Sequence, residues 1–301
     1  MLTRSQVVSK YKKLRTSLGE TQTATEIEKL PPALCRALIL DLVTPSLVRS
    51  PYTGVRRESI KWLSAGKDYV GLYLGSETPP IVANLPLAGH KITVGARHFF
   101  PYIRKSLDLL ASFDPKLVEY IGQWTSLIIW TEREPSYAGT LLTSSTFPML
   151  PHCSFLSSKA LQHIPPNNVL GYVSQYALAE NLYHEALHQE LSAYLLHEDI
   201  LKSSYNSTDT AKIEVPWRGG SWEPDRVFHA VYVYSRLIPL RELALREYNC
   251  SKEEKDWISN SVKEGKIAYQ YLWERLQQNK HIFEKGSLEF VDTVIAEVEM
   301  F

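Results

Sequence analysis

Two histidines four residues apart stand in the stretch AENLYHEALHQEL, residues 179–191. Positions four apart in a helix lie about one turn above each other, so His184 and His188 can point their imidazole nitrogens at one metal ion. Glu185 lies beside them, within reach of a metal-bound water or of a ligand histidine. The same spacing also occurs where two ordinary histidines occupy the polar face of a helix. We interpret it as a metal site because the motif lies within a long predicted helix that is otherwise rich in Leu and Tyr.

Two histidines do not complete a metal site, and the sequence lacks the extensions that two large classes of zinc peptidase use. The residues after the motif, QELSAY, contain neither the glycine nor the third histidine of one class. No later predicted helix carries the Glu-x-x-x-Asp pattern of the other class. His229, on the next predicted helix, is the best candidate for a third ligand, although a histidine on an apolar helix face is commonly part of the core. The competing residues are Glu190, Glu223 and His197, followed by His152 and His163.

Three arginines accompany this candidate ligand. Arg226 and Arg236 share the helical face of His229, and Arg218 precedes that helix in the segment VPWRGG. Guanidinium groups bind carboxylates through two parallel hydrogen bonds. A metal that chelates a dicarboxylate needs such a fixed cation for the far carboxylate, whereas peptide hydrolysis does not. The alternative is that Arg226 and Arg236 form surface ion pairs with the nearby acids Glu223, Asp225 and Glu242.

Apolar periodicity indicates the elements that must hold these residues. Helices are predicted at 3–18, 33–43, 102–122, 171–196, 221–237 and 251–276. Pro239 is expected to end or kink the fifth of them. Strands are predicted in the segments HKITVG, TSLIIWTE, YAGTLLTSSTFPML and HCSFLS of the middle third. Residues 198–220 are mostly polar and predict a long loop between the motif helix and the helix of His229.

These elements predict an α+β fold. We expect a helix-rich single domain over residues 1–301, with a small central β-sheet and a peptidase-like HExxH metal helix. Its expected parts are a helical N-terminal part at 1–85, a mixed helix and strand part at 86–160, and a helical metal-binding part at 171–301. A chain of 301 residues can bury such a core without disulfides.

The composition excludes several kinds of partner. Lys plus Arg equals Asp plus Glu at 33 each, so no net field favours nucleic acid or an anionic membrane. No segment approaches the run of about 20 apolar residues that crosses a membrane. The three cysteines are scattered and no signal peptide is recognisable, which together predict a cytoplasmic protein.

The motif segments resemble a known family. The segment ALAENLYHEALHQEL, followed by VPWR and then by DRVFHAVYVYSRL, is similar to the HExxH-motif peptide-modification family, which acts in pathways of ribosomally made peptides. The resemblance is strongest over roughly residues 125–240. By it, His184, His188 and His229 match the metal ligands and Arg218 matches the arginine of the PWR segment. Where many members carry an Arg-Pro pair, this chain has Trp222, and Arg226 follows one helical turn later.

The resemblance implies an iron(II)- and 2-oxoglutarate-dependent dioxygenase that hydroxylates the β-carbon of a side chain in a precursor peptide. Arg226, Arg218 and Arg236 are then the candidates to bind the co-substrate, and Glu185 orients a ligand imidazole or a bound water. Three histidines suit zinc equally well, so a zinc-dependent peptidase or amide hydrolase with Glu185 as general base remains an alternative. A third interpretation is a non-catalytic peptide-binding protein that uses its many tyrosines and tryptophans.

Overall fold

The structure is a computed structural model that describes residues 59–75, 87, 89–139, 141–147, 152–166, 168–195, 199–205 and 212–299. The helices predicted at 3–18 and 33–43 lie outside these residues. The described chain divides into two compact units, one ending at Glu190 and the other beginning at Leu191. Helices predominate and a small mixed sheet accompanies them, so the predicted α+β class is confirmed. The prediction of one domain over 1–301 stays a prediction.

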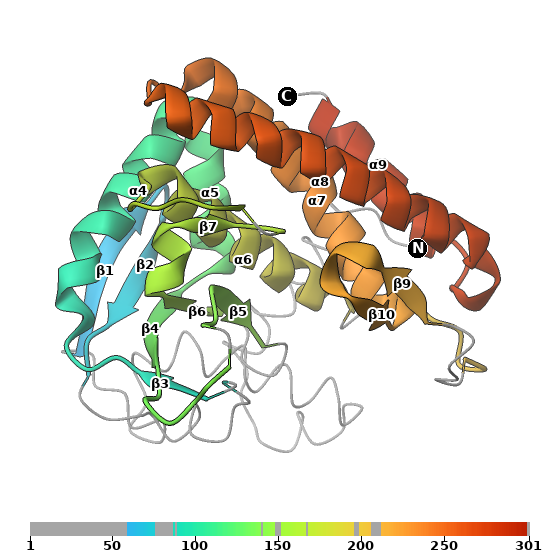
Figure 1. Cartoon of the computed structure of the whole chain (residues 1–301), viewed down its shortest axis with the longest axis horizontal. Coiled ribbons are helices and arrows are strands. Elements are labelled where there is room, and N and C mark those ends of the chain that lie inside the picture. Colours follow the sequence, from blue (N-terminus) through green and yellow to red (C-terminus); the bar gives the residue numbers. More distant parts are fainter. Residues whose placement is uncertain are drawn as a thin grey trace. The chain divides into compact units, whose positions relative to one another are not determined.

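The first unit is built on a six-stranded sheet (Figure 1). Its central strands are β4 (Leu127–Arg133) and β6 (Cys153–Ser157), which run parallel to each other. Both are buried over most of their length, as expected for strands covered on both faces. Strand β5 (Ser144–Thr146) pairs antiparallel with β6 at one edge, and β3 (His90–Ile92) pairs antiparallel with the end of β4. These four strands confirm the strand segments predicted from the sequence.

The other edge of the sheet corrects the sequence prediction. Strands β1 (Ile60–Ala65) and β2 (Asp68–Tyr73) form a hairpin inside the part that was expected to be helical, residues 1–85. Strand β1 is partly buried, with Ile60, Leu63 and Ala65 inside and Lys61 and Ser64 exposed. Gly66 closes the turn with a positive φ of 64°, a conformation that glycine adopts without strain. Strand β2 then joins β4 in parallel.

One face of the sheet carries a compact apolar cluster. It consists of Ile60, Tyr73, Leu87, Ile92, Leu127, Ile129, Cys153 and Phe155. Since successive side chains of a strand point to opposite faces, Ile128 and Leu156 lie on the other face. Directly paired residues of an antiparallel ladder share a face, so Ser144 and Thr146, opposite Leu156 and Ser154, also lie on the face away from the cluster.

Two helices pack against β1 and β2. They are α4 (Phe100–Phe113) and α5 (Pro115–Trp124), where the sequence predicted one helical stretch at 102–122. The break falls at Asp114, whose backbone is extended because the following residue is a proline. The Asp114 side chain then accepts a hydrogen bond from the N–H of Lys116 at 2.9 Å and caps α5. Helix α6 (Gln175–Leu195) follows and contains the motif segment, within the helix predicted at 171–196, and its identity as a peptidase-like metal helix stays a prediction.

The described residues of the second unit form the long helices α7 (Pro224–Glu247), α8 (Lys252–Gln278) and α9 (Ser287–Glu299), of which α7 packs against both others (Figure 1). Ser251 caps α8 as predicted, accepting the N–H of Glu254 at 3.1 Å. The expected end of α7 near residue 237 is wrong, because the helix runs through Pro239 to Glu247. A proline inside a helix costs about 3 kcal/mol, and the burial of α7 on both sides of Pro239 outweighs that cost.

The predicted long loop at 198–220 is also partly wrong. Strands β9 (Ile213–Val215) and β10 (Gly220–Trp222) form an antiparallel hairpin around the PWR turn. Trp217 of that turn meets Tyr271 of α8 edge to face, with ring centroids 5.7 Å apart. The hairpin therefore depends on a contact with a helix about fifty residues later in the chain, which local sequence patterns do not reveal.

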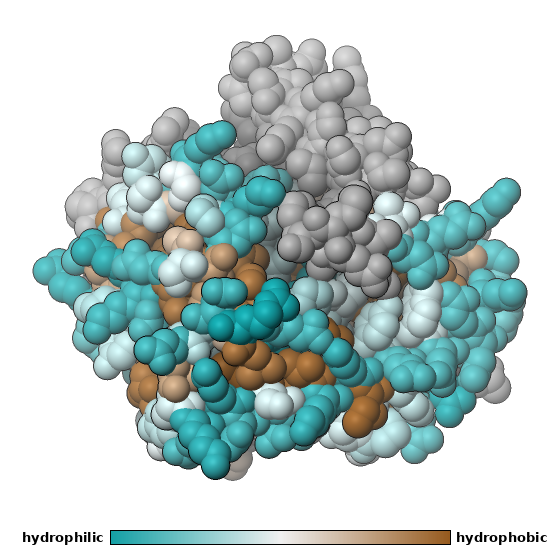
Figure 2. Space-filling model, turned by 90° about the horizontal axis from the view of Figure 1, so that it is seen from above, coloured by the Kyte–Doolittle hydropathy of each residue, from teal (hydrophilic) through white to brown (hydrophobic). Residues whose placement is uncertain are grey.

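The surface that Figure 2 shows is mostly hydrophilic, with hydrophobic side chains gathered between the polar ones. Large hydrophobic side chains that are exposed include Tyr69, Val94, Tyr102, Val169, Val173 and Ile267. No helix in the described part of the chain combines the length and apolar character needed to cross a membrane.

Candidate functional site

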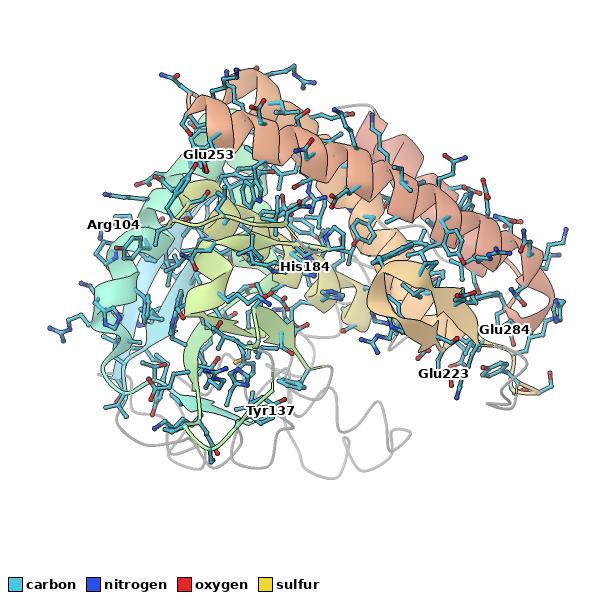
Figure 3. All side chains as sticks on the ribbon, in the orientation of Figure 1. Arg104, Tyr137, His184, Glu223, Glu253 and Glu284 are labelled. Carbon is cyan, nitrogen blue, oxygen red and sulfur yellow. The ribbon has the colours of Figure 1, made fainter. Side chains whose placement is uncertain are left out.

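Helix α6 is buried on nearly all sides, apart from two positions of its motif. Between residues 176 and 191, every position except His184 and His188 is buried. The helix is therefore interior, although several of its buried residues are polar or charged, among them Glu180, Glu185 and Glu190. The imidazoles of His184 and His188 are thus half-exposed groups within an otherwise buried stretch of the helix (Figure 3 labels His184).

The two imidazoles face each other. The Nε2 atoms of His184 and His188 lie 3.0 Å apart. If each nitrogen bound one ion at about 2.0–2.1 Å, this separation would correspond to an angle of about 90–100° at the ion. That angle is close to the right angle between neighbouring ligands of an octahedral ion, and smaller than the about 109° of a tetrahedral one. The same distance also fits a hydrogen bond between one protonated and one unprotonated nitrogen.

Two amide side chains fix the turn that carries the histidines. Asn181 donates from Nδ2 to the carbonyls of Ala160 and His163, at 3.2 and 2.7 Å. Gln189 accepts the N–H of His152 at 3.0 Å and donates to the carbonyl of Cys153 at 2.9 Å. We call Asn181 and Gln189 the amide clamps. They bracket the motif: Gln189 attaches α6 to the start of β6, and Asn181 attaches it to the segment that follows β6, so both ends of the turn with the histidines are held to main chain.

Glu185 lies in a different environment from the histidines. Its side chain is buried, and burial raises the pKa of Glu185 to about 7, while hydrogen bonds with the side chains of Ser144 and Thr146 act to lower it. Its Oε2 atom has no hydrogen-bond partner among the described residues. Ser144 itself donates to Oδ1 of Asn181 at 3.3 Å, which links β5 to the first amide clamp. A carboxyl group that titrates near neutrality can give or take a proton at physiological pH.

Three of the competing ligands from the same unit have structural partners. Glu190 accepts a hydrogen bond of 2.6 Å from the hydroxyl of Tyr120. Nδ1 of His152 contacts the carbonyl of Trp124 at 3.2 Å, and Nδ1 of His163 contacts the hydroxyl of Thr143 at 2.9 Å. His152 also has a positive φ of 59°, a backbone conformation stabilised by the second amide clamp. His197 lies outside the described residues.

The second unit holds the remaining predicted residues. His229 is half-buried on α7, and burial lowers its pKa, although the charge of Asp225 acts in the opposite direction. Arg226 is exposed and its guanidinium carbon lies 4.4 Å above the ring of Trp222, a cation–π contact. Arg236 is buried, with 5% of its surface exposed. Arg218 belongs to the PWR turn, and its side chain is not described.

The surface acids weighed as partners for these arginines bind other groups. Glu223 accepts a hydrogen bond from Tyr205 at 2.9 Å and forms an ion pair with Lys212 at 3.8 Å. Glu242 pairs with Lys266 at 2.6 Å. Asp225, the third of these acids, accepts a hydrogen bond from the backbone N–H of Arg226 at 2.7 Å, and the guanidinium of Arg226 lies over Trp222.

The structure joins His184, His188 and Glu185 with residues that the sequence did not single out. These are the hydroxyls of Ser144 and Thr146 and the amide clamps Asn181 and Gln189. Neither the amide residues, which stand among other polar residues of the helix, nor the hydroxyls of β5 carried a signal in the sequence. Within the described ranges, no group of three or more His, Cys, Asp or Glu side chains is arranged to hold a metal ion.

The sequence was compared with known proteins. No model of a protein family matches the chain, and a search of curated proteins finds no match either.

Proposed function

We propose that this protein is an iron(II)- and 2-oxoglutarate-dependent dioxygenase that hydroxylates the β-carbon of a side chain in a ribosomally made precursor peptide. The observation that carries the proposal is the pair of half-exposed imidazoles, with 3.0 Å between their Nε2 atoms, on a helix that is otherwise buried. The distance is compatible with both nitrogens binding one ion, and an octahedral ion such as iron(II) accommodates the resulting angle of about 90–100°. The resemblance of the motif segments to peptide-modifying proteins supplies the reaction.

The proposed ligands are His184, His188 and, from the sequence, His229. Arg226, Arg218 and Arg236 are the proposed cations for the far carboxylate of 2-oxoglutarate, and Arg226 is the preferred one because it is exposed. Bound iron(II) would supply open coordination positions for the 2-oxo acid and for dioxygen. The amide clamps hold the imidazoles in place, and Glu185 orients a neighbouring imidazole or water.

The first test is turnover without the peptide. Protein purified anaerobically and loaded with iron(II) is exposed to 2-oxoglutarate and air, and succinate is measured. We expect succinate formation that requires both iron and oxygen and that is lost in His188→Ala. His281→Ala, at an exposed histidine of the second unit, is the matched control and should keep wild-type turnover. Once a peptide substrate is known, hydroxylation that persists without 2-oxoglutarate would contradict the proposal.

A zinc-dependent peptidase or amide hydrolase is the second candidate, and the raised pKa of Glu185, about 7, favours it. A carboxyl group in that range is suited to act as general base toward an attacking water. This reaction predicts peptide cleavage that continues without oxygen and stops in Glu185→Gln. Unchanged peptide mass after long incubation with zinc-loaded protein would remove this candidate.

The remaining assignments follow from the first proposal. The partner is a precursor peptide rather than nucleic acid or a membrane, consistent with the equal numbers of acidic and basic residues. We propose a cytoplasmic location, where a ribosomally made peptide would be modified. Fractionation of cells that express the tagged full chain tests this location.

A further inference from the structure

Strand β3 and the connection that leads from β4 to β5 meet at His90. This histidine is the first residue of β3 and is buried, with 5% of its surface exposed. The connection begins after Arg133, the last residue of β4, and ends before Ser144, the first residue of β5. Its first residue is already held beside His90, because the N–H of Glu134 donates to the carbonyl of Gly89 at 2.9 Å.

Both ring nitrogens of His90 form hydrogen bonds with the main chain. The N–H of Leu142, near the end of the connection, donates to Nε2 at 2.9 Å, so Nε2 carries no proton. Nδ1 lies 3.0 Å from the carbonyl oxygen of Leu87, which can only accept, so Nδ1 carries the ring proton and donates it. These two contacts require a neutral imidazole in a single tautomer.

Tyr137, in the middle of the connection, packs at the same place (Figure 3 labels Tyr137). Its ring occupies the space that a side chain at position 89 would need, and Gly89 has a positive φ of 73°. The rings of Tyr137 and His90 meet edge to face, with their centroids 5.8 Å apart. The connection therefore contacts the start of β3 through Glu134, through Tyr137 and through Leu142.

The charged groups next to His90 belong to β3, to β4 and to the first residue of the connection. Arg133 is the partner of His90 in the register of the ladder, and Glu134, next in the chain, is exposed. Lys91 and Glu132, the neighbouring pair, form an ion pair at 3.3 Å on the opposite face, because successive strand residues alternate. A proton on His90 would therefore add a second positive charge at the register position of Arg133.

A proton on Nε2 would turn this nitrogen from an acceptor into a donor. The backbone N–H of Leu142 can only donate, so two donors would then face each other and their hydrogen bond would break. We propose that His90 is a pH-operated latch. It ties the β4–β5 connection to β3 while its imidazole is neutral, and it releases the N–H of Leu142 when the imidazole binds a proton. Histidine ordinarily changes charge between about pH 5 and pH 8, so the latch is closed at the upper end of this range and opens as the pH falls.

The latch lies next to residues that reach the motif helix. Ser144, two residues after Leu142, donates to Oδ1 of the amide clamp Asn181 at 3.3 Å. Ser157 donates from its hydroxyl to the carbonyl of Leu142 and from its N–H to the carbonyl of Thr143, the latter at 3.0 Å. These bonds of Ser157 involve no imidazole, so β5 keeps its place beside β6 when the latch opens. Acid thus loosens the connection locally, at the point where it enters β5.

The experiment follows amide hydrogen exchange of the full-length protein by NMR, expressed as protection factors, which remove the intrinsic dependence of exchange on pH. Loss of one hydrogen bond should lower the protection factor of Leu142 about tenfold between about pH 8 and pH 5. Thr93 is the reference, because its N–H donates to the carbonyl of Trp130 at 2.8 Å and should keep its protection. Nitrogen chemical shifts of the His90 ring report its protonation in the same samples. The change in these shifts and the loss of protection at Leu142 should have the same midpoint.

Two variants give a second readout. His90→Gln keeps an acceptor oxygen and an N–H donor but binds no proton in this pH range. We expect the pH dependence of protection at Leu142 to disappear in this variant. His98→Gln, at an exposed histidine shortly before α4, is the matched control and should keep the wild-type pH dependence. If His90→Gln does not fold, the agreement of the two midpoints in the wild-type protein still decides the question.

A constant protection factor at Leu142 over this pH range would overturn the inference. So would an unchanged pH dependence in His90→Gln. An equal loss of protection at Thr93 would also overturn it, because acid would then loosen the sheet as a whole. Since neither metal nor peptide takes part in the measurement, its outcome is separate from that of the succinate assay.

Discussion

The amide clamp at Gln189 offers the sharpest test of how the candidate site is built. The variant Gln189→Met keeps the length and flexibility of the side chain and removes both hydrogen bonds. The N–H of His152 and the carbonyl of Cys153 then lose a buried partner. A buried polar group left unsatisfied costs about 1–3 kcal/mol. Two such groups predict a loss of about 2–6 kcal/mol in the free energy of unfolding.

Urea unfolding of the metal-free protein measures this loss from the midpoint and the slope of the transition. Gln123→Met, at a half-buried helix position in the same unit, is the matched control. Gln123 forms no hydrogen bond with the described residues, so this variant should stay within about 0.5 kcal/mol of the wild type. A loss below about 1 kcal/mol in Gln189→Met would refute the view that the clamp fixes α6.

The same variant separates stability from metal binding. Because Gln189 follows His188 directly, loss of the clamp should loosen the imidazole pair and weaken metal affinity by about 10–100-fold. Competition with a coloured chelator measures the change in metal affinity without urea, where the variant remains folded. Unchanged affinity in a destabilised variant would mean that the clamp stabilises the fold without positioning the histidines.

Three further outcomes follow from other contacts. Gly122→Ala on α5 would place a Cβ 2.6 Å from the carbonyl of Ala65, so the clash should exceed the helix-propensity gain of about 1 kcal/mol and give a net loss of about 1–2 kcal/mol in urea unfolding. Ser251→Ala should cost about 1 kcal/mol, because the α8 cap is lost. Burial and Glu223 raise the pKa of Tyr205 to about 12, so its stabilising contribution is complete below about pH 10 and is lost as the pH rises through 12. The difference in tyrosinate absorbance between wild type and Tyr205→Phe should therefore have its midpoint near pH 12.

Each of these outcomes has its own control. Gly171→Ala, where a Cβ would meet no atom within 4 Å, should leave stability nearly unchanged. Ser251→Asn should restore the cap of α8. A wild-type stability in Gly122→Ala, equal losses in the two Ser251 variants, or a Tyr205 midpoint near pH 10 would each contradict the corresponding contact.

Helices with strong local signals were predictable from the sequence. The apolar spacing of α6 and the cap at Ser251 both depend on residues within a few positions of one another, and both predictions are confirmed. The predicted end of α7 near Pro239 was wrong, because burial of the helix against α8 and α9 outweighs the local cost of the proline. Local sequence patterns do not report that burial. The hairpin of β9 and β10 was missed for a similar reason, since Trp217 meets a partner in α8.

Some residues of the candidate site were predictable from local sequence patterns, and others were not. His184 and His188 were predictable because helical geometry alone brings positions four apart together. The hydroxyls of Ser144 and Thr146 were not, because their place beside Glu185 depends on strand pairing between β5 and β6 and on the docking of α6. The roles of His229 and of the arginines stay predictions.

Both amide clamps form their hydrogen bonds with main-chain atoms: the carbonyls at positions 160, 163 and 153 and the N–H at position 152. Every amino acid except proline offers those same atoms, so the hydrogen bonds of the clamps do not depend on which side chains stand at these four positions. All four positions are buried, so a substitution there must still fit the surrounding core. An engineer who varies this region should therefore choose side chains by volume and leave the course of the backbone unchanged.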